Sequence, residues 1–161
     1  MPAVSNTSPI SNLAWIGRLN LLRDQFQEVW KAVEMELQNI LDVPVRKIIE
    51  TAKSQGWLKS RSALDTILIG LLTAELHSGE AEAIALALEM KAGSLLVDER
   101  EGRTMARRLG LPLTGVLGVL LRAKRTGKLK AVKPEIEALR EKARFFIAPA
   151  LESAVLAEAG E

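Results

Sequence analysis

Apolar residues recur at helical spacing along most of the chain, and glycines separate these stretches from short apolar runs. The clearest helix begins at Ser78. Its apolar face has an i, i+3, i+4, i+7 spacing and consists of Ala81, Ile84, Ala85 and Leu88. Gly93 is expected to end this helix in a left-handed conformation. The apolar residues 94–97 then predict a short buried strand, and Asp98 stands at its carboxyl end.

The same alternation of helix and short strand extends through the rest of the sequence. Strands are predicted at 3–6, 28–30, 94–97, 111–113 (as strand or loop) and, at an edge of the sheet, 144–148. Helices are predicted from Pro9, over 19–26, 32–41, 45–54, 64–76 and 78–92, from Asp98 to Gly110, over 116–126, from Pro134, and over 149–159. This order favours an α/β fold with a parallel sheet, and no linker divides residues 1–161, so one domain is expected.

Some of these helices carry further local predictions. The helix over 64–76 has apolar residues at helical spacing on much of its surface, so it should be largely buried. Thr114 is a favoured N-cap residue for the helix that begins at Val116, and Gly127 should stop that helix.

Composition restricts the possible chemistry. Aromatic residues make up only 4% of the 161 residues, so an aliphatic core is expected, and without cysteine there is no disulfide or thiolate site. The single histidine, His77, leaves a zinc site without its usual ligands and is expected to lie at the surface or cap a helix. The sequence turns polar by Ser5 and has no apolar run of about 18 residues, so a cytoplasmic protein that does not enter a membrane is expected.

The formal net charge of +2 does not by itself indicate nucleic-acid binding, but positive charge is concentrated between residues 99 and 130. Arg100, Arg103 and Arg107 are spaced by three and four, so they should form one helical stripe that can follow a phosphate backbone. The alternative is a solvated face whose arginines pair with nearby acids.

Acidic and amide side chains near the ends of the predicted elements are the strongest chemical candidates. These residues are Asn6, Glu36, Glu80 and Asp98. Their hard oxygen ligands suit Mg²⁺ or Mn²⁺, and such an ion can bind a phosphate oxygen and activate a water for phosphodiester hydrolysis. The chain has no Walker, dinucleotide-binding or nucleophile-elbow motif, which argues against nucleotide binding and serine hydrolysis.

Each acid also has a purely structural interpretation. Asp98 and Glu101 match a capping box at the start of a helix. Glu80 lies in the first turn of its helix, where a negative charge offsets the helix dipole. Glu36, like Glu34, fits the solvated side of an amphipathic helix.

Several blocks of the sequence resemble the PIN-domain-like proteins, in particular the prokaryotic group of predicted nucleic-acid-binding PIN proteins related to VapC toxins. The blocks are VSNTSPISNLAWIGRLNLL, AVEMEL, LHSGEAEAIALALEMKAGSLLVDEREGRTMARRLGL and TGVLGVLLRAKRTGKL. The resemblance implies a three-layer α/β/α PIN-like domain with a short, mostly parallel central sheet. Family members hold Mg²⁺ or Mn²⁺ at the carboxyl edge of that sheet and cleave RNA.

Carried over by position, the resemblance implies a metal site formed by Asn6, Glu36, Glu80 and Asp98. Thr7 and Ser8 fall beside the first of these and would hold a water or a phosphate. Asn6 stands where the family has Asp, which removes one negative charge. The short segment before Glu36 leaves Glu34 as an alternative ligand.

These observations lead to two functional hypotheses. The first is a metal-dependent ribonuclease that acts as the toxin of a toxin–antitoxin pair, with Arg100, Arg103 and Arg107 on the RNA backbone. The second is a catalytically weakened PIN-like module that binds RNA or protein, as Asn6 suggests. The resemblance also implies a homodimer and a small antitoxin partner, and the apolar segment 64–72 is a candidate for the dimer interface.

Overall fold

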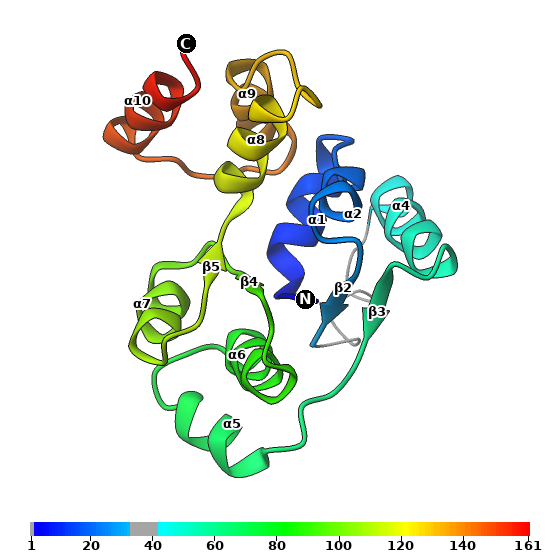
Figure 1. The fold of residues 1–161 in the computed structure, drawn as a ribbon, viewed down its shortest axis with the longest axis vertical. Helices are drawn as coiled ribbons and strands as arrows, with labels where there is room; N and C mark the ends of the chain where they lie inside the picture. The colour runs from blue at the N-terminus through cyan, green and yellow to red at the C-terminus, as the bar shows by residue number, and fades with distance from the viewer. Residues whose placement is uncertain (1, 33–41) are drawn as a thin grey trace.

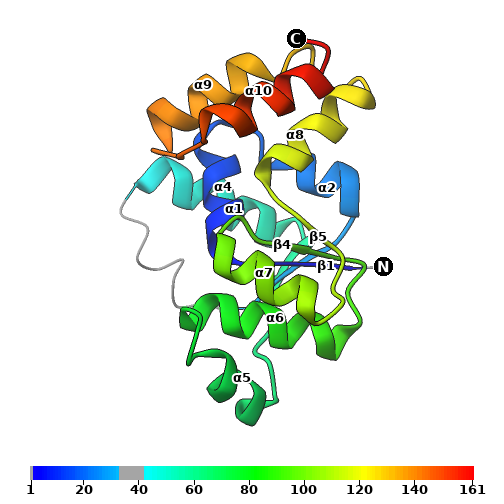
Figure 2. The ribbon, with the colours of Figure 1, turned by 90° about the vertical axis from the view of Figure 1, so that its left-hand side faces the viewer.

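The computed structural model describes residues 2–32 and 42–161, and these form a parallel sheet between two layers of helices (Figures 1 and 2). The strands are β1 (Ala3–Ser5), β2 (Val29–Lys31), β3 (Leu58–Ser60), β4 (Ser94–Leu96) and β5 (Leu113–Thr114). Their order is β3-β2-β1-β4-β5, and every neighbouring pair is parallel. The predicted three-layer α/β/α architecture is confirmed.

Helices cover both faces of the sheet (Figure 1). On one side lie α1 (Thr7–Trp15), α2 (Asn20–Phe26), α4 (Val43–Ser54), α8 (Val116–Arg125), α9 (Lys133–Lys142) and α10 (Pro149–Glu158). On the other side lie α5 (Thr66–Leu72), α6 (Ser78–Met90) and α7 (Arg100–Arg108). Successive strand residues point to opposite faces, so Val4 and Leu95 join the second core while Ala3 and Leu96 join the first. Both cores are almost entirely aliphatic, as the composition predicted.

The order in which strands are added to the sheet changes sides between β1 and β4. From β1 it extends to β2 and β3, and then returns through α5 and α6 to β4 on the other side of β1. Asn6 follows β1 and Asp98 follows β4, and the Asn6 N–H donates to the carbonyl of Leu96 at 3.1 Å. In parallel α/β sheets this switch point, at the carboxyl ends of the strands, is where ligands bind.

The prediction of an edge strand at 144–148 is wrong, and β3, which was not predicted, forms one edge of the sheet. After α9, Arg144 adopts a left-handed conformation with φ of 53°, and the Phe145 N–H donates to the carbonyl of Leu139 at 3.0 Å. This turn directs the chain along the helical layer, outside the sheet, toward α10.

Two predicted helix ends are also shifted. Lys91, with φ of 50°, provides the left-handed end of α6 in place of Gly93, and Gly115 is the N-cap of α8 because Thr114 belongs to β5. The expected turn at Gly127 is confirmed by its φ of 74°. The helix predicted over 32–41, which carries Glu34 and Glu36, falls almost entirely outside the described residues.

The prediction that residues 64–76 form a largely buried helix is wrong. Helix α5 is only seven residues long, and Leu64, Ile67 and Leu71 are 76%, 78% and 70% exposed. Only one side of α5 contacts α6, through Leu72 and its neighbours, so the remaining apolar residues have no core to enter. Within residues 2–32 and 42–161, no helix is long and apolar enough to cross a membrane.

The exposed fractions of two isoleucine side chains predict that replacement by alanine affects stability strongly at one position and hardly at the other. Ile84→Ala removes a fully buried side chain from α6 and should lower the free energy of unfolding by about 2–5 kcal/mol. Ile67→Ala should change it by less than about 0.5 kcal/mol, because the side chain is already in water. Urea denaturation measures both values. A loss of several kcal/mol at Ile67 would show that α5 is covered in solution.

Candidate metal centre

The carboxyl group of Glu80 lies buried where α6, α7 and the end of β4 meet. Glu80 is in the first turn of α6 and is only 2% exposed. Its Oε2 has no hydrogen-bond partner among the described residues. A Cβ on Gly102 of α7 would lie 2.5 Å from this Oε2 and 2.9 Å from Val97 Cγ2. A side chain at residue 102 would therefore force Glu80 or Val97 to shift.

Glu80 forms a compact group with two further residues, His77 and Glu99. One ligand atom from each lies within 4.8 Å of the other two. Burial raises the pKa of the Glu80 carboxyl group to about 7, and the hydrogen bond and negative charge of Glu99 add to the shift, whereas His77 opposes it. Each carboxyl group at this separation disfavours ionisation of the other, and a shared proton or a bound cation would relieve the repulsion.

Asp98 caps a different helix from the one predicted. Its Oδ1 accepts a hydrogen bond of 2.9 Å from the N–H of Val116, the first residue of α8, whereas the N-cap of α7 is Glu99. The capping-box interpretation of Asp98 with Glu101 is therefore wrong. A Cβ on Gly115 would lie 2.5 Å from Asp98 Oδ1, so this approach also requires glycine.

The second oxygen of Asp98, Oδ2, is buried and has no hydrogen-bond partner among the described residues. Burial raises the pKa of Asp98 to about 6; the Val116 N–H and Arg103 oppose the shift, and Glu99 adds to it. Because Glu99 raises the pKa of both Asp98 and Glu80, it lies within electrostatic reach of each.

Glu80 and Asp98 open onto different hollows on either side of the start of α7. Glu80 and His77 line a hollow of about 270 Å³. Asp98 lines a larger cleft of about 530 Å³ between α7 and the helices α8 and α10. Among the described residues, the compact group around Glu80 does not include Asp98.

Asn6 and Thr7 lie at the carboxyl end of β1, as expected. Asn6 is buried, and its Oδ1 accepts a 2.8 Å hydrogen bond from the Thr7 N–H, so it serves as the N-cap of α1. The hydroxyl of Thr7 is buried without a hydrogen-bond partner in the described part of the chain. Ser8 is half-buried, and its carbonyl accepts from Ser11 Oγ at 3.1 Å.

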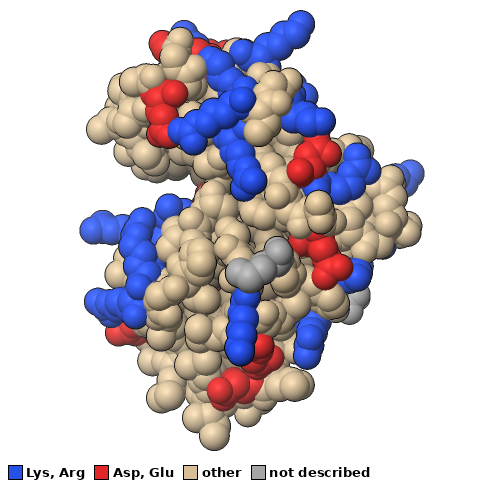
Figure 3. Space-filling view, viewed as in Figure 1, with Lys and Arg blue, Asp and Glu red and all other residues tan. Residues whose placement is uncertain are grey.

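The predicted arginine stripe lies on one side of the cleft. Arg100, Arg103 and Arg107 all line it, and Arg103 Nη1 donates to the carbonyl of Val97 at 2.9 Å. None of the three forms an ion pair with a carboxylate that the structure describes. Figure 3 shows the molecule hollowed on its left side, between α10 and α7, with Lys and Arg atoms along the lower edge.

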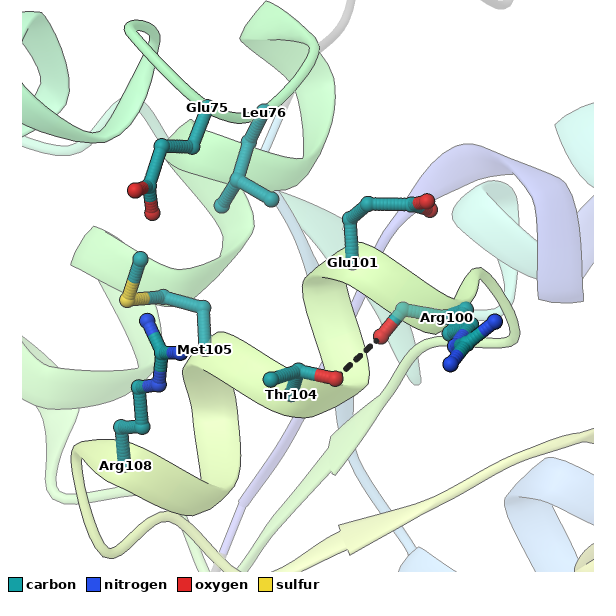
Figure 4. A pocket seen from close by; sticks show the side chains of 7 residues that line it. All are labelled: Glu75, Leu76, Arg100, Glu101, Thr104, Met105 and Arg108. Carbon is teal, nitrogen blue, oxygen red and sulfur yellow. Dashed lines mark hydrogen bonds between the residues drawn. The ribbon is translucent and has the colours of Figure 1, made fainter.

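A separate hollow of about 230 Å³ lies on the other side of α7 (Figure 4). Glu75 and Leu76 reach toward α7 from the segment before α6, opposite Met105 and Arg108. Arg100 borders both this hollow and the larger cleft. Arg103 and Arg107 thus face the larger cleft, whereas Arg100 lies between the two hollows.

Comparison with known families agrees with this arrangement. A family model described as PIN domain (DUF3368) matches residues 2–161. The chain belongs to the PIN-domain family. A search of curated proteins and a search of solved structures each found no match. PIN domains are nuclease folds, so membership points to a nuclease-type hydrolase.

The residues of this PIN domain fit a hard divalent cation. The buried Oε2 of Glu80 and Oδ2 of Asp98 have no hydrogen-bond partner in the described chain, and carboxylate oxygens are the ligands that Mg²⁺ and Mn²⁺ prefer. Glu80 and Glu99 are also close enough to repel one another when both are ionised. A cation held by Glu80 and Glu99 would neutralise this repulsion, and the unpartnered oxygen of Asp98 lies outside that compact group.

Sequence reasoning missed two members of the compact group. His77 was expected at the surface or as a cap; it is the exposed N-cap residue of α6, without a side-chain capping bond, and it also adjoins Glu80. Its position three residues before Glu80, on the same side of a helix start, was the available signal. For Glu99, the only indication in the sequence was that it directly follows Asp98.

The raised pKa of Glu80 predicts how pH affects the stability of the metal-free PIN domain. The folded chain holds the Glu80 proton up to about pH 7, but the unfolded chain releases it near the usual carboxyl value of 4.5. Stability should therefore fall as pH rises from about 5 to 8. With EDTA present, Tm of the wild type should decrease over this range by more than that of Glu80→Gln. An equal decrease in both proteins would contradict the assignment of the shift to Glu80.

Proposed function

We propose that this PIN-domain protein is a metal-dependent endoribonuclease that hydrolyses RNA phosphodiester bonds. The observation that carries the proposal is the presence of two acids near the carboxyl end of β4, the buried Glu80 and the half-buried Asp98, each with one buried oxygen that has no hydrogen-bond partner among the described residues. These residues would hold Mg²⁺ or Mn²⁺, with Glu99 beside them and Asn6 at the neighbouring strand end. Glu36 completes the predicted ligand set from the stretch outside the described residues, with Glu34 as its alternative.

The bound ion would supply Lewis-acid activation of the phosphodiester and its attacking water. Around it, the chain would position the substrate. Arg100, Arg103 and Arg107 face the same cleft as Asp98, so they are suited to hold the phosphates next to the scissile bond. Thr7 would contribute its unpartnered hydroxyl to the phosphate or a water, and Ser8 lies beside it.

We also propose a biological setting for this activity. The resemblance to VapC-related PIN proteins supports a toxin role, in which a small antitoxin protein would bind and silence the nuclease. The same resemblance supports a homodimer as the working form.

Replacement of either of these two acids by its amide should abolish most RNA cleavage. Asp98→Asn and Glu80→Gln keep the size of each side chain, and an asparagine at 98 can still accept the hydrogen bond from Val116. Loss of a metal-ligand charge should reduce kcat/KM for RNA by at least about 100-fold. Single-turnover cleavage with Mn²⁺ measures this, and circular dichroism checks the fold. Glu141→Gln, an exposed change on α9, is the matched control and should cleave normally. Cleavage at the wild-type rate by both amide variants would refute the proposal.

Asn6 supports a second candidate, a PIN-like module that binds RNA or protein but cleaves weakly. Its Oδ1 already accepts the Thr7 N–H, and an amide carries no charge to attract a cation. Asn6→Asp would restore an acid at the end of β1 while keeping the cap. For a weakened enzyme, Mn²⁺ affinity by calorimetry and the cleavage rate should both rise about tenfold or more. If neither changes and the wild type cleaves RNA, position 6 does not limit the chemistry.

A further inference from the structure

The wall of the cleft opposite the arginine stripe is apolar and partly aromatic. It is formed by α8, by α10 and by the connection between α9 and α10. Its apolar side chains are Leu117, Leu121, Phe145, Phe146, Leu151 and Val155. The cleft volume of about 530 Å³ lies within the range of about 300–1,000 Å³ that is usual for ligand sites. Figures 1 and 2 both place α10 on the far side of the β5–α8 connection from α7.

Phe146 is exposed on this wall, and the residues on either side of it are held in place. It is 84% exposed, whereas the next residue, Ile147, is buried in the core beneath α9 and α10. The preceding residue is held by the hydrogen bond from the Phe145 N–H to the Leu139 carbonyl. A single exposed apolar residue is common on protein surfaces. Here, however, Phe146 continues an apolar wall that includes Leu151, which is 50% exposed.

The two walls together match the chemistry of a nucleotide. Arg100, Arg103 and Arg107 supply positive charge without carboxylate partners among the described residues, which suits phosphates. An aromatic face suits a base, since every base has a planar face that can stack. A nucleotide carries both groups on one unit and can therefore contact both walls.

We propose that the Phe146 wall is a base-binding subsite, on which an unpaired base next to the phosphates held by the arginine stripe stacks. This inference rests on the proposed function, because Asp98 and the subsite share one cleft. Stacking on Phe146 requires a base whose face is free, and the bases of a duplex are already stacked on one another. The subsite thus selects single-stranded RNA.

A polypeptide is the alternative occupant, and the structure favours RNA over it. A peptide would need acidic side chains for the arginines and apolar ones for the opposite wall. Those acidic side chains would also approach Asp98, whose Oδ2 already lacks a partner in the described chain. RNA is also the substrate of the proposed function, so its phosphates reach the arginines of this cleft whether or not a divalent cation is bound.

The test measures RNA binding without cleavage. A fluorescein-labelled single-stranded RNA of about twelve nucleotides is titrated in EDTA, and its anisotropy gives Kd for the wild type and three variants. Phe146→Ala should weaken binding about 5- to 100-fold, and Phe146→Trp, which keeps an aromatic face, should stay close to the wild type. Ile48→Ala, a change at an exposed apolar residue on α4, should have no effect. Duplex RNA of the same sequence should bind equally to the wild type and Phe146→Ala.

A second experiment identifies the RNA base that Phe146 contacts. Abasic positions are placed one at a time along the RNA, and one of them should weaken wild-type binding by the factor seen for Phe146→Ala. That position should not weaken Phe146→Ala further, because the stacked pair is already lost. Equal binding by the wild type and Phe146→Ala, or additive effects of the two changes, overturns the subsite and leaves the wall to a polypeptide. If the wild type cleaves the same RNA once Mn²⁺ replaces EDTA, the proposed function stands without the subsite. If it neither binds RNA in EDTA nor cleaves it with Mn²⁺, both proposals fail.

Discussion

Glu80 is held in a place where its charge is unfavourable, and the surrounding structure is built to keep it there. Helix α6 inserts it beneath the start of α7, and Gly102 is the residue that permits the contact. Burial and the nearby Glu99 both disfavour ionisation, as the pKa of about 7 shows. A buried negative charge of this kind lowers the stability of the folded chain unless a cation or a proton neutralises it. The nuclease site that we propose would draw its affinity for a cation from this constraint.

Asp98 links the acidic site to the outer helices. One oxygen caps α8 through Val116, and the other is unpartnered within the described chain. The same carboxylate therefore fixes the start of α8, and α8 packs against α10, the other helix of the apolar wall. Asp98 thus carries a charge of the proposed site, caps α8 and lines the cleft.

Much of the fold and part of the site could be predicted from local sequence. The strands at 3–6, 28–30 and 94–97, and the helices that alternate with them, follow from short apolar runs and helical periodicity. The family resemblance implied that Asn6 and Asp98 lie at the carboxyl edge of the sheet, and the strand order places the strands that they follow, β1 and β4, side by side. The strand at 58–60 was missed, because three residues at a sheet edge carry almost no periodicity.

The sequence by itself determined the α/β class, the aliphatic cores, the acids at element ends and the arginine stripe, because these depend on spacing within a single segment. Only the tertiary structure decided which segments meet. It turned the apolar side of α5 to solvent, assigned Asp98 to the cap of α8, and brought His77 and Glu99 to Glu80. It also placed Phe146 across a cleft from α7, which is remote in sequence. Contacts between distant segments depend on packing and chain direction, and neither is encoded in local periodicity.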